Sequence, residues 1–321
     1  MTNNCTKGTE EGFDAYALRL YQNREAYGLT SFDIAKLLND AAGTHKGESA
    51  WRKYYKAFRQ GTMYVQSSLP TILCLSDLHY PFILPIETFA AYRGVNTLVL
   101  NGDLLDCQSL SVFDKSYRIN PVDEMRGLRD YLRDLITYLN CRKVFITVGN
   151  HDIRLKSYIA GRIDTEIKEL LPDTPLEYLF VDGWIHYDKL THAKTNYAPL
   201  CNILSNVAFT YTGTWWCKVG RTIFCHPSAF SSVILKTAEK AVAYFHNIGE
   251  DFDCLVLGHT HRCGKAQQGG ITIIEQGAAC QVEKMQYTAG KLTSPQVKAC
   301  AVITQHKDGK INEAQSGYVL L

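Results

Sequence analysis

The sequence predicts an α/β protein that carries a small all-α module at its amino terminus. From residue 70 onward, short apolar and β-rich runs alternate with helical stretches, which is the pattern of a sheet covered by helices. The first 60 residues show helical periodicity alone. A hydrophobic share of 46% against 21% charged residues indicates an ordinary soluble globular chain. We expect the two domains to cover residues 1–66 and 67–321.

Three helices are predicted in the amino-terminal module. The first covers residues 13–27. The second follows Thr30, which caps it together with Asp33 in the manner of a capping box. The third covers residues 48–58, and residues 61–69 are expected to link the module to the larger domain.

The third helix combines an aromatic face with a neighbouring basic stripe. The aromatic residues are Trp51, Tyr55 and Phe58, and the basic residues are Arg52, Lys56 and Arg59. Residues 1–66 carry nine Lys/Arg against seven Asp/Glu, whereas the rest of the chain is balanced, so the excess positive charge lies here. The arrangement is similar to a helix-turn-helix module that binds nucleic acid through its third helix. The connection over residues 39–48 is longer than that motif's turn, and a helical bundle with a solvated basic face is the alternative.

The larger domain contains eight runs that are predicted as strands. They cover residues 71–76, 97–101, 143–148, 207–212, 222–226, 254–258, 271–275 and 299–305. The last of them is expected to pair with residues 311–321 across a hairpin turn at residues 307–310. The clearest helices cover residues 121–140 and 234–248.

Cysteine usage and the polar amino terminus bear on the compartment. The eleven cysteines are an odd number without any Cys-x-x-Cys pair, which favours reduced thiols over a disulfide scaffold or a zinc ribbon. The first residues lack the apolar core of a signal peptide, and no apolar stretch reaches membrane-spanning length. We therefore expect a cytoplasmic protein without a membrane partner.

Polar side chains follow five of the predicted strands at the point where each strand ends. They are Asp77, His79, Asp103, Asp106, Asn150, His151, His226, His259 and His261. One His-x-His pair alone would be unremarkable, but five strand ends in series are not explained by chance. Because ligand sites form at the carboxyl edge of an α/β sheet, we expect these side chains to converge there.

The order of these motifs (D-x-H, GD-x-x-D, GNHD, a lone His and GH-x-H) resembles that of the calcineurin-like metallophosphoesterase superfamily. The resemblance covers about residues 70–263 and implies a two-sheet β-sandwich flanked by helices. It also implies hydrolysis of a phosphoester at two divalent metals. Such a pair, about 3.5–4 Å apart, neutralises the anionic phosphate and lowers the pKa of the attacking water.

The resemblance also implies a role for each motif residue. The expected ligands are Asp77, His79 and His261 for the first metal, Asn150, His226 and His259 for the second, and Asp103 between the two. His151 is expected to face the leaving oxygen, as general acid or charge stabiliser, and to be held by Asp106. Imidazole mixed with hard oxygen donors favours manganese, iron, zinc, cobalt or nickel over magnesium and calcium, and manganese is our first choice.

At two positions the sequence differs from known branches of the family, and these differences narrow the class of substrate that we expect. Cys107 follows the GD-x-x-D motif where the protein Ser/Thr phosphatases carry arginine, and Cys225 precedes His226 where the cyclic-nucleotide branch often has a second histidine. GDLLD with its Ser-rich turn, together with GNHD, is similar to the DNA-repair exonuclease branch. We therefore predict a phosphodiesterase or nuclease that acts on nucleic acid.

Two other functions stay open. One is a phosphomonoesterase or small-nucleotide hydrolase whose amino-terminal module binds protein. The other is a non-catalytic DNA-binding protein with a relic phosphoesterase fold, against which the intact ligand set argues. A basic helical module joined to such a domain resembles proteins encoded by phages and prophages, and such an origin would place the protein in the host cytoplasm.

Three features near the motifs have alternative interpretations. The aromatic run over residues 211–216 either stacks bases over the site or belongs to the core. Arg154, Lys156 and Arg162 either meet substrate phosphates or form a solvated helix face. Asp152 either stabilises its turn or has a functional role.

Overall fold

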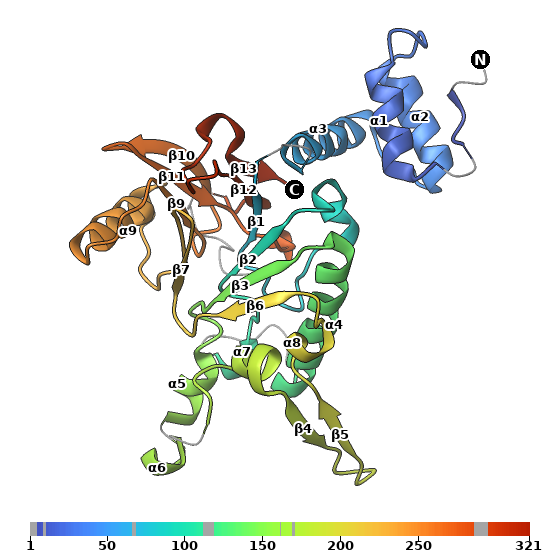
Figure 1. The fold of residues 1–321 in the computed structure, drawn as a ribbon. Helices are drawn as coiled ribbons and strands as arrows, with labels where there is room; N and C mark the ends of the chain where they lie inside the picture. The colour runs from blue at the N-terminus through green and yellow to red at the C-terminus, as the bar shows by residue number, and fades with distance from the viewer. Residues whose placement is uncertain are drawn as a thin grey trace.

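The structure is a computed structural model that describes residues 5–8, 11–65, 69–111, 119–160, 162–168, 171–285 and 295–321, with the backbone alone for residues 57–65, 165 and 168. Figure 1 shows three helices at the amino terminus, followed by a body built around two sheets. The body is a two-sheet sandwich flanked by helices, and the predicted fold class is confirmed. Within the described residues, no helix combines the length and the apolar character needed to cross a bilayer.

The amino-terminal module packs three helices around one small core. They are α1 (Phe13–Gln22), α2 (Ser31–Ala42) and α3 (Glu48–Val65). The core contains Tyr16, Ala17, Leu20, Tyr21, Ile34, Ala35, Leu38 and Trp51. The predicted capping box is confirmed, since Thr30 accepts a hydrogen bond from the Asp33 backbone and the Asp33 carboxylate accepts one from the Thr30 backbone.

Two of the predicted helix boundaries are wrong. Helix α1 ends at Gln22, five residues early, because Asn23 leaves the helical conformation and its N–H closes the last turn. Helix α3 continues to Val65, so residues 61–65 are helical where a linker was predicted. Helix α3 lies against η2 (Ile86–Tyr92), and its helical backbone continues through Gly61 despite the low helix propensity of glycine.

The larger sheet has six strands in the order β13-β12-β1-β2-β3-β6. The strands are β1 (Thr71–Leu75), β2 (Thr97–Asn101), β3 (Lys143–Thr147), β6 (Ala208–Tyr211), β12 (Ala299–Thr304) and β13 (Gly317–Leu320). Four neighbours, β1, β2, β3 and β6, run parallel. Leu75, Leu100 and Ile146 lie in one row, so the three chain segments that follow them leave the sheet at the same edge.

The smaller sheet has five strands in the order β10-β11-β9-β8-β7. They are β7 (Trp216–Val219), β8 (Thr222–Cys225), β9 (Cys254–Leu257), β10 (Cys263–Gln268) and β11 (Ile271–Gln276). Parallel pairing of β8 with β9 aligns Cys225 with Leu257. His226 and Gly258 therefore follow their strands at one level.

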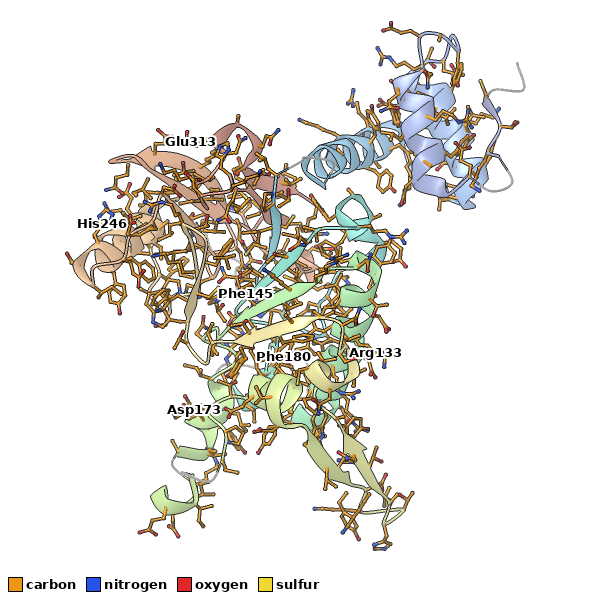
Figure 2. All side chains as sticks on the ribbon, in the orientation of Figure 1. Arg133, Phe145, Asp173, Phe180, His246 and Glu313 are labelled. Carbon is orange, nitrogen blue, oxygen red and sulfur yellow. The ribbon has the colours of Figure 1, made fainter. Side chains whose placement is uncertain are left out.

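The sandwich has helices on both outer faces. In β1, Leu73 and Leu75 contact the cluster that includes α4 (Pro121–Leu139), whereas Ile72 and Cys74 face the second sheet. This double burial explains the continuous apolar run of that strand. On the other side, α9 (Lys236–Asn247) covers the five-stranded sheet. Figure 2 shows side chains filling these layers, including Phe145 of β3, which packs against the cluster between the sheets.

The remaining elements are short. They are η3 (Gln108–Leu110), α5 (Arg154–Ala160), α6 (Thr165–Lys168), α7 (Pro175–Glu177), η4 (Tyr178–Asp182), α8 (Leu200–Ile203), η5 (Val282–Lys284), η7 (Glu313–Gln315) and the hairpin of β4 (Trp184–Tyr187) with β5 (Lys194–Tyr197). The sequence predicted neither this hairpin nor β7 and β10. It also predicted strand over residues 311–321. The chain returns there through the turn η7, and only β13 joins β12 as a strand.

Candidate metal centre

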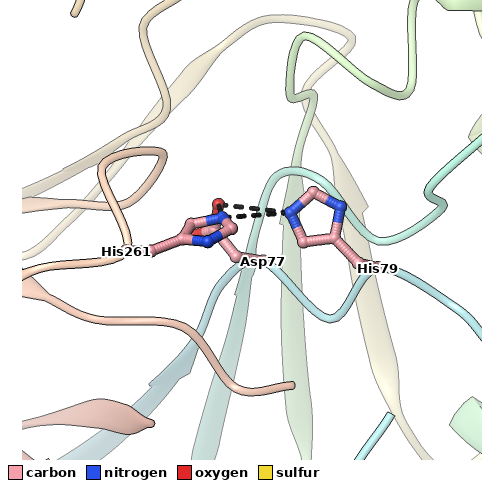
Figure 3. A group of neighbouring side chains, drawn as sticks. All are labelled: Asp77, His79 and His261. Carbon is pink, nitrogen blue, oxygen red and sulfur yellow. Dashed lines mark hydrogen bonds and ion pairs between the residues drawn. The ribbon is translucent and has the colours of Figure 1, made fainter. Parts of the chain in front are cut away.

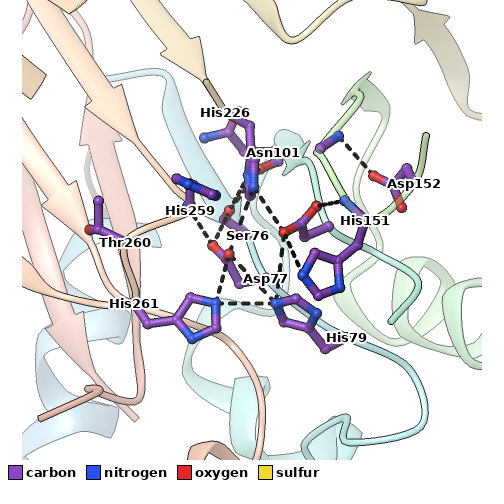
Figure 4. Close-up of polar contacts among 12 residues, drawn as sticks. Ser76, Asp77, His79, Asn101, His151, Asp152, His226, His259, Thr260 and His261 are labelled. Carbon is purple, nitrogen blue, oxygen red and sulfur yellow. Dashed lines mark hydrogen bonds and ion pairs between the residues drawn. The ribbon is translucent and has the colours of Figure 1, made fainter. Parts of the chain in front are cut away.

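The motif side chains converge at the edge where the two sheets end together. Figure 4 shows six of them, namely Asp77, His79, His151, His226, His259 and His261. Three overlapping groups bring their ligand atoms within 4.8 Å of one another. The groups are Asp77 with His79 and His261, His79 with Asp103 and His151, and Asp103 with His226 and His259. Asn150 lines the same pocket as His226. The predicted basic stripe lies elsewhere, on α3: Arg52 and Lys56 are exposed, and the side chain of Arg59 lies outside the described residues.

The first group joins one carboxylate and two imidazoles (Figure 3). His261 Nε2 lies 3.0 Å from Asp77 Oδ1 and 3.1 Å from His79 Nε2. His79 Nε2 is in turn 3.7 Å from Asp77 Oδ1. The other ring nitrogen of His79 is 3.2 Å from Asp106 Oδ1, which favours a proton on Nδ1 and leaves a lone pair on Nε2.

The second group is built around His226, which is fully buried. Its Nδ1 donates to the Asn101 carbonyl at 2.7 Å, so Nε2 presents a lone pair. That nitrogen lies 3.1 Å from Asp103 Oδ2. Two acceptor atoms at this distance repel unless a proton or a metal ion lies between them.

Asp103 lies between the two groups. Its Oδ2 is 3.9 Å from Nε2 of His79 and 3.9 Å from Nε2 of His151, besides its contact with His226. Its other oxygen accepts the backbone N–H of His151 at 2.7 Å. The second oxygen thus fixes the direction in which the first one points.

The donor set fits divalent metal ions. Asn150 Oδ1 is buried and has no hydrogen-bond partner among the described residues. A buried polar atom without a partner destabilises the folded state by about 1–3 kcal/mol, so such atoms usually serve a ligand. Carboxylate, amide and neutral imidazole donors suit a divalent transition metal, without choosing among several such ions.

The backbone at these positions is strained. Five ligand-type residues have left-handed φ values: Asp77 (57°), His79 (45°), Asp103 (50°), His259 (77°) and His261 (54°). This conformation costs a residue with a Cβ about 1–2 kcal/mol, and such strain gathers at functional sites. The two histidines of the His-x-His motif lie in different groups. His261 belongs to the first group and His259 to the second.

A family model described as calcineurin-like phosphoesterase matches residues 70–263, which is more than half of the chain. The chain belongs to the calcineurin-like phosphoesterase family. A second model, described as the YonJ N-terminal domain, matches residues 1–70.

Individual relatives are more distant. The SPbeta prophage-derived uncharacterized protein YonJ of Bacillus subtilis (strain 168) is 34% identical over 56 residues, which are 17% of this chain and 14% of the relative. The match thus spans about one seventh of the length of that relative. A solved archaeal phosphodiesterase is 15% identical over 78% of this chain and 99% of its own, with a TM-score of 0.39. A metallophosphoesterase from Sphaerobacter thermophilus is 15% identical over 79% of this chain and 88% of its own, with a TM-score of 0.37.

In this calcineurin-like phosphoesterase, Asp106 holds two histidines rather than one. Its Oδ1 lies 3.2 Å from Nδ1 of His151, as predicted, and also 3.2 Å from Nδ1 of His79. Burial alone would raise the pKa of Asp106, but hydrogen bonds from His151 and His79 outweigh it and lower that pKa below its ordinary value. The carboxylate is therefore ionised and orients both rings.

Arg154, for which the sequence left two roles open, lies within the site. Its guanidinium donates to the Asp106 carbonyl at 2.7 Å, and another nitrogen lies 3.0 Å from His151 Nε2. Because arginine only donates, Nε2 of His151 is the acceptor and Nδ1 carries the proton. Burial lowers the pKa of His151 below its ordinary value, which agrees with a neutral ring.

Two buried acids hold the loops that carry these residues. Asp152 accepts the backbone N–H groups of Leu104 and Leu105 at 3.1 Å each and that of Gly149 at 2.9 Å, so it stabilises the turn. Glu124, which the sequence analysis missed, accepts the Cys107 N–H at 2.6 Å. The sequence carried a signal for this residue, because Glu124 lies one helical turn before Leu128 and so falls on the apolar face of α4.

Motif glycines allow the ligand loops to touch. A Cβ on Gly149 would lie 2.1 Å from Asp103 Oδ1, and one on Gly258 would lie 2.0 Å from Ser76 Oγ. Neither contact is sterically possible. The packing of the site therefore requires glycine at both positions, Gly149 before Asn150 and Gly258 before His259.

The Gly149→Ala variant tests this requirement. The added methyl must displace Asp103, and we expect metal affinity to fall about 10–100-fold, as when a group that supports a metal ligand is lost. Isothermal titration of the metal-free protein with Mn²⁺ measures the affinity. Gly12→Ala is the matched control, because a Cβ there meets no heavy atom within 4 Å. Unchanged affinity in Gly149→Ala would contradict the packing argument.

The buried Glu124 predicts a pH-dependent stability. Burial raises the pKa of Glu124 from an ordinary 4.5 to about 7. Between these values the folded chain holds a proton that the unfolded chain has released, so the free energy of unfolding falls as pH rises through this window. We expect the free energy of unfolding, measured by urea denaturation, to fall less in Glu124→Gln than in the wild type as the pH rises from about 5 to about 8. Glu166→Gln removes an exposed carboxylate of α6 and is the control; equal losses in all three proteins would refute the assignment.

Proposed function

We propose that this chain is a dinuclear metal-dependent phosphoester hydrolase that cleaves phosphodiester bonds in nucleic acid. The observation that carries the proposal is the pair of donor groups that share Asp103, beside a neutral His151. A carboxylate shared by two such groups is the arrangement expected for two closely spaced cations. The same clusters are hard to explain in a protein that only binds DNA.

The proposed ligands are those expected from the motifs. Asp77, His79 and His261 would hold one ion, Asn150, His226 and His259 the other, and Asp103 both. When bound, the ions neutralise the phosphate and lower the pKa of water. Manganese remains our first choice, with iron, zinc, cobalt and nickel as alternatives.

The remaining groups would act on the substrate directly. Hydrolysis forms a bond from a water oxygen to phosphorus, breaks the ester P–O bond and leaves a proton on the departing alcohol. His151 is held by Asp106 through Nδ1, so its Nε2 is the atom that would face the leaving oxygen; as a neutral acceptor, Nε2 would first take up a proton released by the attacking water and then pass it to that oxygen. Arg154 can keep its bond to the Asp106 carbonyl while its second nitrogen binds a phosphate oxygen.

Replacing His151 separates catalysis from metal binding. We expect His151→Asn to keep about two ions per chain and to lower kcat by about 10²–10⁴-fold, the effect of losing a general acid. Asp103→Asn should weaken both ions, because it removes the negative charge between them. Metal content after dialysis and turnover of a phosphodiester reporter are measured on the same samples. If His151→Asn loses its metal together with its activity, His151 belongs among the ligands.

A hydrolysis screen with Mn²⁺ tests the substrate class. The compounds are bis(4-nitrophenyl) phosphate, 4-nitrophenyl phosphate, and single- and double-stranded DNA. Cleavage of the diester and of DNA is the expected result. Turnover of the monoester alone would favour the phosphomonoesterase or small-nucleotide hydrolase, and DNA binding without any turnover would favour the non-catalytic protein.

We further propose that residues 1–66 form a helix-turn-helix-like module that contacts nucleic acid and is joined to the phosphoesterase domain over residues 67–321. Trp51 is buried in the module and Tyr55 stacks on Tyr21 with ring centroids 4.2 Å apart, so the aromatic side of α3 faces inward. Arg52 and Lys56 are exposed beside it. The connection from α2 to α3 has five residues, against three or four in the usual turn, so the motif itself stays a prediction.

The state of the cysteines supports a cytoplasmic location. All eleven are free, which fits a reducing compartment. If the chain is encoded by a phage, as the prophage origin of its relative suggests, that compartment is the host cytoplasm.

Salt dependence of DNA binding tests the basic stripe. Contacts to phosphate make the log of the affinity fall with log salt by about 0.9 per phosphate on duplex DNA. Replacing Arg52, Lys56 and Arg59 by Ala in the full chain should flatten this slope by up to about three units. Hydrolysis of a small chromogenic diester should not change.

The matched control for this experiment removes three exposed basic residues of the module that lie outside α3. They are Lys7, Arg24 and Lys36. The control should keep the wild-type slope more closely than the stripe variant does. Equal slopes for all three proteins would remove the support for a nucleic-acid role of α3.

A further inference from the structure

A pocket of ≈ 550 Å³ opens beside the second donor group. Two of the proposed ligands, Asn150 and His226, form part of its lining. Ile153, Trp215 and Tyr244 supply large apolar surfaces to the same pocket. Its volume lies within the usual range of small-molecule sites, about 300–1,000 Å³. A group bound here would therefore adjoin the reacting phosphate.

Trp215 and Tyr244 form an aromatic wall of the pocket, and this wall is fixed relative to the metal centre. The backbone carbonyl of Trp215 accepts the N–H of His226 at 2.7 Å, which ties the wall to a ligand. The Trp215 ring packs against Tyr244 and Phe245 of α9, each with ring centroids 5.3 Å apart. Within the aromatic run over residues 211–216, Trp215 and Trp216 both pack against the core, and Trp215 also lines the pocket, where base stacking stays a prediction.

The wall leaves apolar surface open next to a polar centre. Tyr244 is 46% exposed and Ile153 is 41% exposed. Aromatic faces of this kind stack on nucleobases, with a contribution of about 1–3 kcal/mol per base. A phosphoester with a small alkyl group would leave both surfaces in water.

The described lining of the pocket carries a positive charge and no carboxylate. Lys240 of α9 is the single lysine or arginine among the described lining residues, and none of these residues is Asp or Glu. A nucleotide that reaches beyond the base would place its next phosphate against a cation and away from any carboxylate. A cationic group would meet repulsion from Lys240 here.

We infer that this pocket is a nucleoside subsite, which holds the base on one side of the scissile phosphate against Trp215 and Tyr244 and the next phosphate at Lys240. The inference rests on the proposed phosphodiesterase function and deepens it by naming what the ester carries. It assigns substrate selection to the region between β6 and α9. The metal ligands themselves do not select the base.

Two chromogenic diesters with the same leaving group test the subsite. They are thymidine 5′-(4-nitrophenyl phosphate) and methyl 4-nitrophenyl phosphate, assayed with Mn²⁺. We expect a higher kcat/KM for the nucleoside ester. Tyr244→Ala should lower it about 5–150-fold, the equivalent of losing 1–3 kcal/mol, and leave the methyl ester unchanged. Trp215→Phe, which keeps a ring in the packed position, should show a smaller loss of the same kind.

Tyr187→Ala is the matched control, because Tyr187 is also 46% exposed but lies on the β4–β5 hairpin and does not line the pocket. It should behave as the wild type on both esters. Equilibrium dialysis of the metal-free protein with thymidine and with thymidine 3′,5′-bisphosphate gives a readout without turnover. Lys240→Ala should weaken binding of the bisphosphate and not that of thymidine.

The outcomes separate the two proposals. If the wild type cleaves both esters at equal kcat/KM, the subsite is wrong while the phosphodiesterase function stands. If Tyr244→Ala slows both esters alike, the wall has a structural role and the subsite is again wrong. If neither diester is cleaved under conditions in which 4-nitrophenyl phosphate is, the phosphodiesterase function itself fails.

Discussion

The carboxylate of Asp103 joins the two sheets at the edge where both end. It belongs to the loop after β2 in the larger sheet, yet it lies 3.1 Å from His226, which follows β8 in the smaller one. Its second oxygen is held by the backbone of His151, which follows β3. Three strand ends from two layers therefore meet at one side chain. The register of the parallel strands is what brings them to a common level.

Imidazolium charges offset part of the carboxylate charge in the buried site when no cation is bound. Burial alone would lower the pKa of His79, but Asp106 and Asp77 raise it to about 10. Burial likewise opposes the charged form of His226, while Asp103 and Asp77 raise its pKa to about 9. Protons on these rings stand where the ions would act, so metal uptake has to release protons. Without ions, the carboxylates are stabilised by imidazolium charges.

The sequence located the strand ends better than the elements between them. Strand ends could be recognised because each buried run, such as TILCL before Asp77, stops at a polar motif. The β4–β5 hairpin could not be recognised, because its residues are largely exposed and carry no continuous apolar run. The spacing between Arg154 and His151 gave no direction for the guanidinium, and only the loop conformation turns it toward Nε2. Helix α3 also contacts η2, and no local pattern encodes that tertiary contact.

The loops after β2 and β3 exchange hydrogen bonds in both directions. Asp103 accepts from the backbone of His151, and Asp152 accepts from the backbones of Leu104 and Leu105. Such a reciprocal clamp makes the two loops move as one body, so a ligand shift in one is transmitted to the other. Asp103 on the first loop and Asn150 on the second are therefore held at a fixed separation by these hydrogen bonds to the backbone.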